Sequence, residues 1–214
     1  MLRNDPSLFW FLLSGQRYEA EKALSLLKAH TKSVEKQLEK ESSDFEEWLQ
    51  QKAETLTSLQ RDELYEFYGE DLEIMTSDLP SIHRSAMFLS AYALLEHHLN
   101  EYCKLFHDVG EITLKLNEVA GQGIERAKIY LSKVIGVSFP INQQQWMEIR
   151  RLNQVRNILV HRNGELDETS DKAVIEYVRT SPLMQLTRSQ EITLKKDSMI
   201  AVISLFEDFF KELY

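Results

Sequence analysis

The sequence predicts a nearly all-helical fold, and two observations carry that prediction. The 214 residues include only 7 Gly and 4 Pro, which leaves little material for a turn-rich β architecture. Residues 17–76 are charged, studded with leucine and almost free of both breakers, a pattern typical of long helices. Because apolar residues make up 43% of the chain, it can also bury a sizeable core.

The first part of the chain, residues 1–78, is expected to be an extension of long helices that pack on the rest. Lysines alternate with glutamates between residues 19 and 41, which indicates a solvated helix with i,i+4 pairs. Its apolar positions form only a narrow stripe. The run Ser42-Ser43-Asp44 predicts a kink or a break.

The second part, residues 79–214, is expected to be a helical domain that begins near Pro80, since proline is favoured in a first helical turn. The segment from 79 to about 107 carries a broad apolar face and should be the central helix. Further helices are expected over 124–137, from Pro140 to about 162, where Asn163-Gly164 ends the helix, and over 199–213. Residues 174–178 fit a helix or a strand. A short β-piece is expected within 185–194.

Composition bounds the compartment and the partners. Cys103 is the only cysteine, so no internal disulfide can form. The apolar run from Leu8 to Leu13 is too short to span a bilayer and follows Asp5-Pro6, unlike a secretory signal. We therefore expect a cytoplasmic protein with no membrane association.

The net charge of -9 means that attraction to nucleic acid is not a global property. Any RNA contact must then be local. A local basic stretch exists, since no acidic residue lies between Arg150 and Arg162, a segment that also contains Arg151 and Arg156.

Several other polar patterns have simpler interpretations. The histidines in Glu96-His97-His98 point about 100° apart on a helix and cannot share one metal ion without help. Cys103 lacks the His and Asn partners of a catalytic cysteine and is expected to be a small buried apolar side chain. The segment 121–123 lacks the preceding strand and the following lysine of a phosphate-binding loop. No metal site and no cofactor are therefore expected.

The segment 150–164 places chemistry on one face of a helix. With Arg156 at zero and about 100° per residue, the polar residues Asn153, Asn157, Arg150 and His161 fall between about 60° and 140°. The apolar residues Leu152, Val155 and Leu159 fall roughly between 260° and 320°, with Ile149 and Val160 just past zero. Arg156 sits at the margin of the apolar face. A guanidinium there needs a carboxylate or a phosphate. Glu96 is the candidate structural partner, with His161 then merely complementing the helix dipole.

The run Arg156-Asn157-Ile158-Leu159-Val160-His161 resembles the signature of the HEPN superfamily (higher eukaryotes and prokaryotes nucleotide-binding), an Arg, a polar residue and a His on the third core helix. The resemblance covers roughly residues 79–213 and excludes the N-terminal helices. It implies a four-helix up-and-down core that dimerises. It also implies metal-independent RNA cleavage at a composite site built from two protomers.

The resemblance further implies roles for individual residues. His161 would act as base or acid on the 2′-hydroxyl or the leaving 5′-oxygen, Arg156 would hold the scissile phosphate, and Asn157 would orient either group. A histidine titrates near neutral pH, and an arginine fork matches phosphate oxygens. The residues expected to support the site or to bind RNA are Glu96, Arg150, Asn153 and Arg162.

The sequence therefore predicts a HEPN-type endoribonuclease, active as a homodimer, with a toxin or phage-defence role. Toxin members paired with a nucleotidyltransferase antitoxin often carry a modified tyrosine two places after the histidine, where this chain has Asn163. That departure puts antitoxin control by tyrosine modification in doubt. Two alternatives remain open: a non-catalytic HEPN protein that binds a partner through residues 17–76, and a plain helical scaffold with a salt-bridged arginine.

Overall fold

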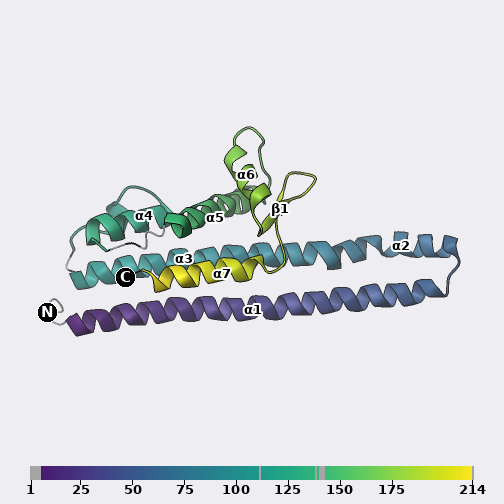
Figure 1. Ribbon diagram of the computed structural model, residues 1–214, viewed down its shortest axis with the longest axis horizontal. Helices are drawn as coiled ribbons and strands as arrows, with labels where there is room; N and C mark the ends of the chain where they lie inside the picture. Colours follow the sequence, from purple (N-terminus) through teal and green to yellow (C-terminus); the bar gives the residue numbers. More distant parts are fainter. Residues whose placement is uncertain (1–5, 111, 138, 140–142, 214) are drawn as a thin grey trace.

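The computed structural model describes residues 6–110, 112–137, 139 and 143–213, and it confirms the all-α prediction (Figure 1). The elements, in chain order, are α1 (Pro6–Glu54), α2 (Ser58–Glu73), the π-helical η2 (Ile74–Asp78), α3 (Leu79–Gly110), the 3₁₀ turn η3 (Leu116–Glu118), α4 (Gly123–Ile129), the π-helical η4 (Tyr130–Ile135), α5 (Gln143–Arg162), α6 (Lys172–Thr180), β1 (Met184–Leu186), β2 (Ile192–Leu194) and α7 (Ser198–Lys211). None of these helices is long and apolar enough to cross a membrane.

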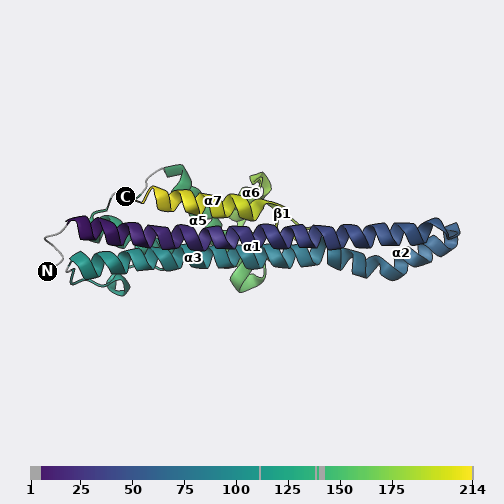
Figure 2. The same ribbon diagram turned by 90° about the horizontal axis from the view of Figure 1, so that it is seen from below.

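The longest feature is a hairpin of α1 against the continuous run from α2 through η2 to α3 (Figure 1). Helix α7 lies along both long helices over one half of the hairpin, and α4, α5 and the small sheet cover α3 on the same half (Figures 1 and 2). Helix α6 packs on α5 and β1. The other half, residues 41–73, projects alone. We call this projecting part the distal arm and the remainder the body.

Helix α2 joins α3 without a break, although the sequence predicts a boundary at Asp78–Leu79. The N–H of Leu79 donates to the carbonyl of Ile74, five residues back. Pro80 has no N–H to donate, and its ring would press on the carbonyl of Thr76 in a regular helix. The wider π turn accommodates the proline, so the boundary is a change of hydrogen bonding inside one helix.

The predicted kink at Ser42-Ser43-Asp44 is wrong, because α1 runs unbroken to Glu54. Packing explains the difference. Just after the serines, Phe45 and Trp48 stack on each other at 5.5 Å, and both contact Tyr68 of α2 edge-on. These contacts hold the helix where weak local propensities would allow a break.

Helix α3 is the centre of the body, as its broad apolar face predicts. Its fully buried residues include Phe88, Tyr92, Leu95, Leu99 and Tyr102. They pack on an aromatic row of α7, and the ring of Tyr92 meets that of Phe206 edge-on at 5.8 Å. The core is therefore a set of interlocking aromatic rings between α3, α5 and α7.

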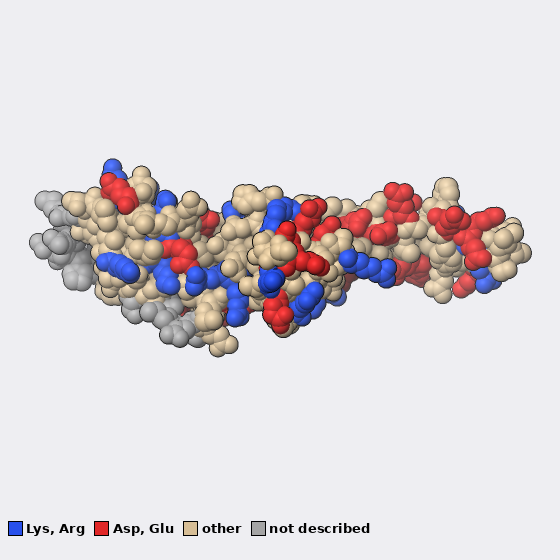
Figure 3. Space-filling model, turned by 90° about the horizontal axis from the view of Figure 1, so that it is seen from above, with Lys and Arg blue, Asp and Glu red and all other residues tan. Residues whose placement is uncertain are grey.

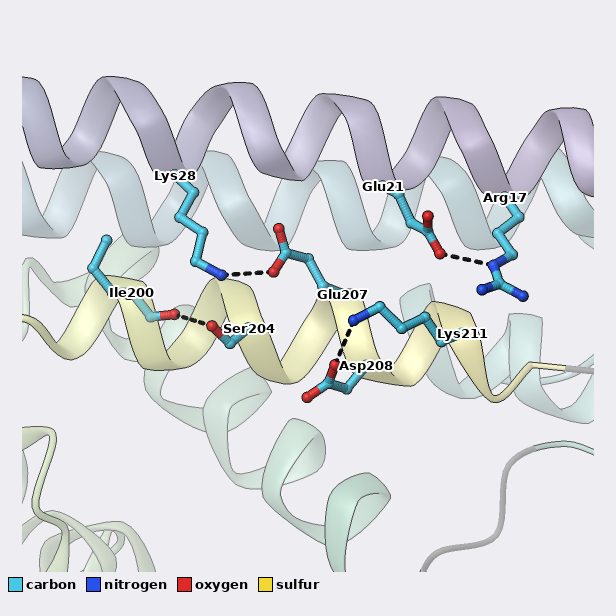
Figure 4. Close-up of polar contacts among 8 residues, drawn as sticks. All are labelled: Arg17, Glu21, Lys28, Ile200, Ser204, Glu207, Asp208 and Lys211. Carbon is cyan, nitrogen blue, oxygen red and sulfur yellow. Dashed lines mark hydrogen bonds and ion pairs between the residues drawn. The ribbon is translucent and has the colours of Figure 1, made fainter.

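Polar contacts fix α1 to the body. Lys28 Nζ lies 2.7 Å from Glu207 Oε2 of α7 (Figure 4). Arg84 of α3 donates two hydrogen bonds, of 2.7 and 2.9 Å, to the carboxylate of Glu35. Leu24 of α1 is fully buried. Helix α1 thus packs on the helical core along its first half, through Leu24, Lys28 and Glu35.

The end of α5 confirms the predicted stop at Asn163-Gly164. Both residues have positive φ, 51° and 92°, and the N–H of Gly164 donates to the carbonyl of Ile158 at 3.3 Å, as in a helix C-cap. The open segment 174–178 is helical, within α6. Strands β1 and β2 pair antiparallel and span 184–194, one residue beyond the predicted β-piece at its start. Pro140, expected to open α5, lies outside the described residues.

Candidate functional site

Helix α5 presents two distinct faces, as the wheel predicts. Ile149, Leu152 and Val155 are fully buried against the core. Arg150, Asn157 and His161 are exposed, while Asn153 and Arg156 are half-buried at the margin. Val160, expected beside the apolar face, is 45% exposed. The candidate residues therefore share one open side of α5, with an apolar side chain among them.

The hydroxyl of Tyr92 marks where α5 crosses α3. It is buried and donates to the carbonyl of Ile149 at 3.4 Å. Burial raises the pKa of Tyr92; the charges of Glu96 and Glu125 raise it further, and Arg156 lowers it. The guanidinium of Arg156 thus lies close enough to this buried hydroxyl for its charge to act there, with two carboxylates nearby.

The expected ion pair between Arg156 and Glu96 is not formed. The carboxylate of Glu96 instead lies against the start of α4, where Oε1 is 3.3 Å from the position that a Cβ on Gly123 would take. Nη1 of Arg156 donates to Oδ1 of the neighbouring Asn157 at 3.1 Å. Among the described residues no carboxylate forms an ion pair with Arg156, so this half-buried guanidinium has no directly paired acid.

The other arginines of the predicted basic stretch all have acidic partners. The pairs are Arg150 Nε with Glu125 Oε1 at 2.6 Å, Arg151 Nη1 with Glu148 Oε2 at 3.7 Å, and Arg162 Nη1 with Asp171 Oδ2 at 2.7 Å. These acids lie outside residues 150–162, which is why the linear sequence looks basic. The stretch is thus largely neutralised in three dimensions, and Arg156 carries its unpaired charge.

The hydrogen bond between Arg162 and Asp171 also lowers the pKa of that carboxyl. Asp171 in addition accepts a 2.8 Å hydrogen bond from the N–H of Asp167. Arg162 therefore ties the end of α5 to the loop before α6, and its role here is structural as well as electrostatic.

His161 lies exposed in the last turn of α5. Within the described part of the chain its ring makes no hydrogen bond or ion pair. A cavity of 320 Å³ beside α5 is lined by Arg150 and Asn153, among others, but not by Arg156, Asn157 or His161. Within the described residues, the three motif residues of one protomer therefore lie outside this cavity.

Net charge is distributed very unevenly. The distal arm holds eleven acidic and two basic residues. The arm's net charge of -9 equals the net charge of the whole chain. Acidic side chains accordingly predominate at the projecting end in Figure 3, whereas both signs mix over the body. Acidic and basic residues are therefore equal in number in the body, and the negative charge that disfavours RNA binding lies in the distal arm.

The adjacent histidines on α3 have unlike environments. The rings of His97 and His98 lie 5.0 Å apart at 71°. His98 is buried edge-on against Phe210, and burial lowers its pKa. No group of three or more potential metal ligands occurs among the described residues. His98 is thus part of the aromatic core.

A second cavity, of 390 Å³, lies between α3, η3 and α4. Lys104, Lys115 and Arg126 line it together with Glu96. No spacing along the chain predicts this cavity, because its cations come from three separate segments that converge only in the fold. Glu96 therefore belongs to this cavity more directly than to the face of Arg156.

Comparison of the chain with protein-family models, with curated proteins and with solved structures finds no match.

Proposed function

We propose that this protein is a metal-independent endoribonuclease of the HEPN type, acting through Arg156, Asn157 and His161. The observation that supports the proposal is the charge of Arg156. A half-buried guanidinium without a carboxylate is costly unless an anion completes it. Its neighbours on the open face are an amide and a histidine, and a phosphate of RNA supplies the missing anion.

The chemistry follows from the residue types. A base takes the proton of the 2′-hydroxyl, whose oxygen forms a bond to the adjacent phosphorus. The bond from phosphorus to the 5′-oxygen breaks, and an acid protonates that oxygen, leaving a 2′,3′-cyclic phosphate and a 5′-hydroxyl. Arg156 binds the non-bridging oxygens as charge develops. Asn157 holds the guanidinium through its 3.1 Å hydrogen bond.

This reaction needs both a base and an acid, and each chain offers one histidine at the motif. We propose that a symmetric homodimer supplies the second, with the C-terminal half of α5 at the two-fold axis. The 45% exposed Val160 provides an apolar contact there. Val160→Glu should give monomers by light scattering and greatly reduced cleavage. A fully active monomeric variant would contradict the composite site.

The direct test is incubation of the pure protein with RNA in EDTA, followed by analysis of the ends. We expect cyclic phosphates, and no cleavage of a substrate whose 2′-hydroxyls are replaced by hydrogen. His161→Ala should lower the rate by about 10²–10⁴-fold without loss of folding, because His161 is exposed. Cleavage of the deoxy substrate would refute the mechanism.

Arg156→Lys separates catalysis from folding. Lysine keeps the charge and much of the stem but lacks the fork that grips two phosphate oxygens. We expect a folded dimer that cleaves about 10²-fold more slowly. Arg179→Lys, on the exposed face of α6, is the matched control and should keep full activity. Full activity of Arg156→Lys would remove Arg156 from the site.

A second candidate function, a non-catalytic binding protein, is favoured by the surface of the distal arm. Leu59 and Phe67 are 70% and 75% exposed on a helix rich in glutamate. Charge complementarity then calls for a protein partner with a basic, partly apolar surface. A purified partner should lose binding to a Leu59→Ser/Phe67→Ser variant and bind His161→Ala normally. Unchanged binding to the serine variant would exclude the arm as its site.

A further inference from the structure

We propose that the 390 Å³ cavity between α3, η3 and α4 binds a phosphate monoester whose organic part donates a hydrogen bond to Glu96. The site shares none of its lining residues with Arg156, Asn157 and His161. Binding there is therefore separate from the proposed cleavage, and either can fail without the other.

The phosphate end of the site is set by three cations. Lys104 comes from α3, Lys115 from the segment that leads into η3, and Arg126 from α4. Within the described residues none of the three forms an ion pair, although nine other pairs join charged groups of this chain. Three like charges facing one cavity repel unless an anion lies between them, and a phosphate dianion is the biological group that suits such a set.

The guanidinium of Arg126 is already oriented. Its Nε donates to the carbonyl of Gly121 at 2.8 Å, which holds the side chain against the loop. The terminal nitrogens have no acceptor in the described part of the chain. An arginine held in this way presents its remaining N–H groups to a ligand at little cost in side-chain entropy.

The other end of the site is set by Glu96. Its half-buried carboxylate has no hydrogen-bond donor among the described residues. Gly123, with φ of 50°, leaves room for that carboxylate, whose Oε1 would be 3.3 Å from a Cβ. A carboxylate repels a phosphate, so it must face a different part of the ligand, and an amine or hydroxyl satisfies it.

The spacing sets the size of the ligand. Glu96 and Lys104 are eight residues apart on α3, about 12 Å along the helix axis. Between them Asn100 and Cys103 line the wall, and Cys103 stays a neutral thiol because burial raises its pKa to about 12. Inorganic phosphate is too small to reach both ends. A nucleoside monophosphate or a similar phosphorylated molecule spans the distance.

The test is calorimetric titration of the full-length protein at about 0.15 M salt, the physiological ionic strength. The probes are inorganic phosphate, ribose 5-phosphate, cytidine 5′-monophosphate and cytidine. We expect cytidine 5′-monophosphate to bind most tightly and cytidine most weakly. Arg126→Ala should weaken binding of the monophosphate about tenfold or more, the loss of one charged hydrogen bond. Binding by none of the phosphorylated probes overturns the proposal.

Two further variants make the result specific. Arg179→Ala removes the same charge from exposed α6 and should leave binding unchanged; an equal loss there would show only bulk electrostatics. Glu96→Gln should weaken cytidine 5′-monophosphate while leaving inorganic phosphate as tight or tighter. A loss for both probes would contradict the role assigned to Glu96. Melting curves establish that each variant is folded.

A last pair of probes distinguishes the source of the phosphate. A short RNA with a 5′-phosphate is compared with the same RNA ending in a 5′-hydroxyl, both on His161→Ala so that no cleavage interferes. Preference for the phosphorylated RNA, lost in Arg126→Ala, identifies an RNA end as the ligand. Equal binding of the two RNAs, with the free monophosphate still bound, identifies a small molecule.

Discussion

The distal arm and the body are made of the same kind of helix but are stabilised in different ways. In the body, α3 is covered on several sides, and the rings of α3, α5 and α7 interlock. In the distal arm two helices meet along a single seam, with Leu49 buried and Phe67 75% exposed. The comparison shows that long charged helices need only a narrow seam to pair, whereas a chemical site needs the rigid, many-sided packing of the body.

The largest expected difference comes from the same truncation made in both regions. Leu95→Ala in the body and Leu49→Ala in the arm each remove a side chain that is at most 2% exposed. We expect Leu95→Ala to cost about 2–5 kcal/mol of unfolding free energy, because the surrounding rings cannot close the cavity. Leu49→Ala should cost less, since the two arm helices can move together. Equal losses in urea unfolding would mean that the arm is packed as rigidly as the body.

The pH dependence of the unfolding free energy should arise from groups in the body. His98 is buried, which lowers its pKa below 6.5, and the charge of His97 lowers it further, whereas Glu101 and Glu19 raise it. The folded protein therefore binds fewer protons than the unfolded chain, so stability is full above about pH 6.5 and declines as the pH falls. Unfolding free energies from pH 7.5 to 5 should show this decline.

The matched variants for that measurement are His98→Gln and His161→Gln. The first should flatten the decline, leaving the part due to His83, whose pKa burial also lowers. The second changes an exposed histidine of α5 and serves as the comparison for the loss of an imidazole from the surface. An identical slope in His98→Gln and the wild type would show that His98 does not contribute.

A smaller effect is expected from the contact that joins α1 to α7. Lys28 and Glu207, 24% and 16% exposed, are 2.7 Å apart, as Figure 4 shows. A double-mutant cycle with alanine should give a coupling of about 1 kcal/mol. The more exposed pair Lys211–Asp208 within α7 is the control, at about 0.2–0.5 kcal/mol. A larger coupling in the control pair would contradict this ranking.

Removal of most of the distal arm should have the smallest effect on the stability of the body. Deleting residues 41–54 and 58–71 takes 14 residues, close to four turns, from each helix and keeps the connecting Thr55-Leu56-Thr57. We expect the melting midpoint of the body, and any RNA cleavage of the kind proposed above, to stay near wild type, because the proposed site lies on α5. Loss of cleavage with intact folding would instead assign the arm a part in RNA binding or dimerisation.

Much of the fold could be predicted from the sequence because the decisive signals are local. The scarcity of glycine and proline, the apolar face from Phe88 to Phe106 and the cap at Asn163-Gly164 each act within a few residues. The kink expected at 42–44, and the boundary at Asp78–Leu79 that proves to be a π turn inside one continuous helix, were also predicted from local signals. Ring packing around Tyr68 and a π turn overrode them, and both depend on partners or hydrogen bonds that periodicity does not show.

The candidate site divides in the same way. The sequence by itself determined that Arg156 lies at the margin of the apolar face with Asn157 and His161 beside it, because helix geometry fixes the angle between residues of one helix. Only the tertiary structure decided which acidic residues pair with the arginines of α5. Glu125, Glu148 and Asp171 neutralise the neighbouring arginines, and Glu96 faces α4 instead of Arg156. Charges act through space, over distances that the order of residues along the chain does not set.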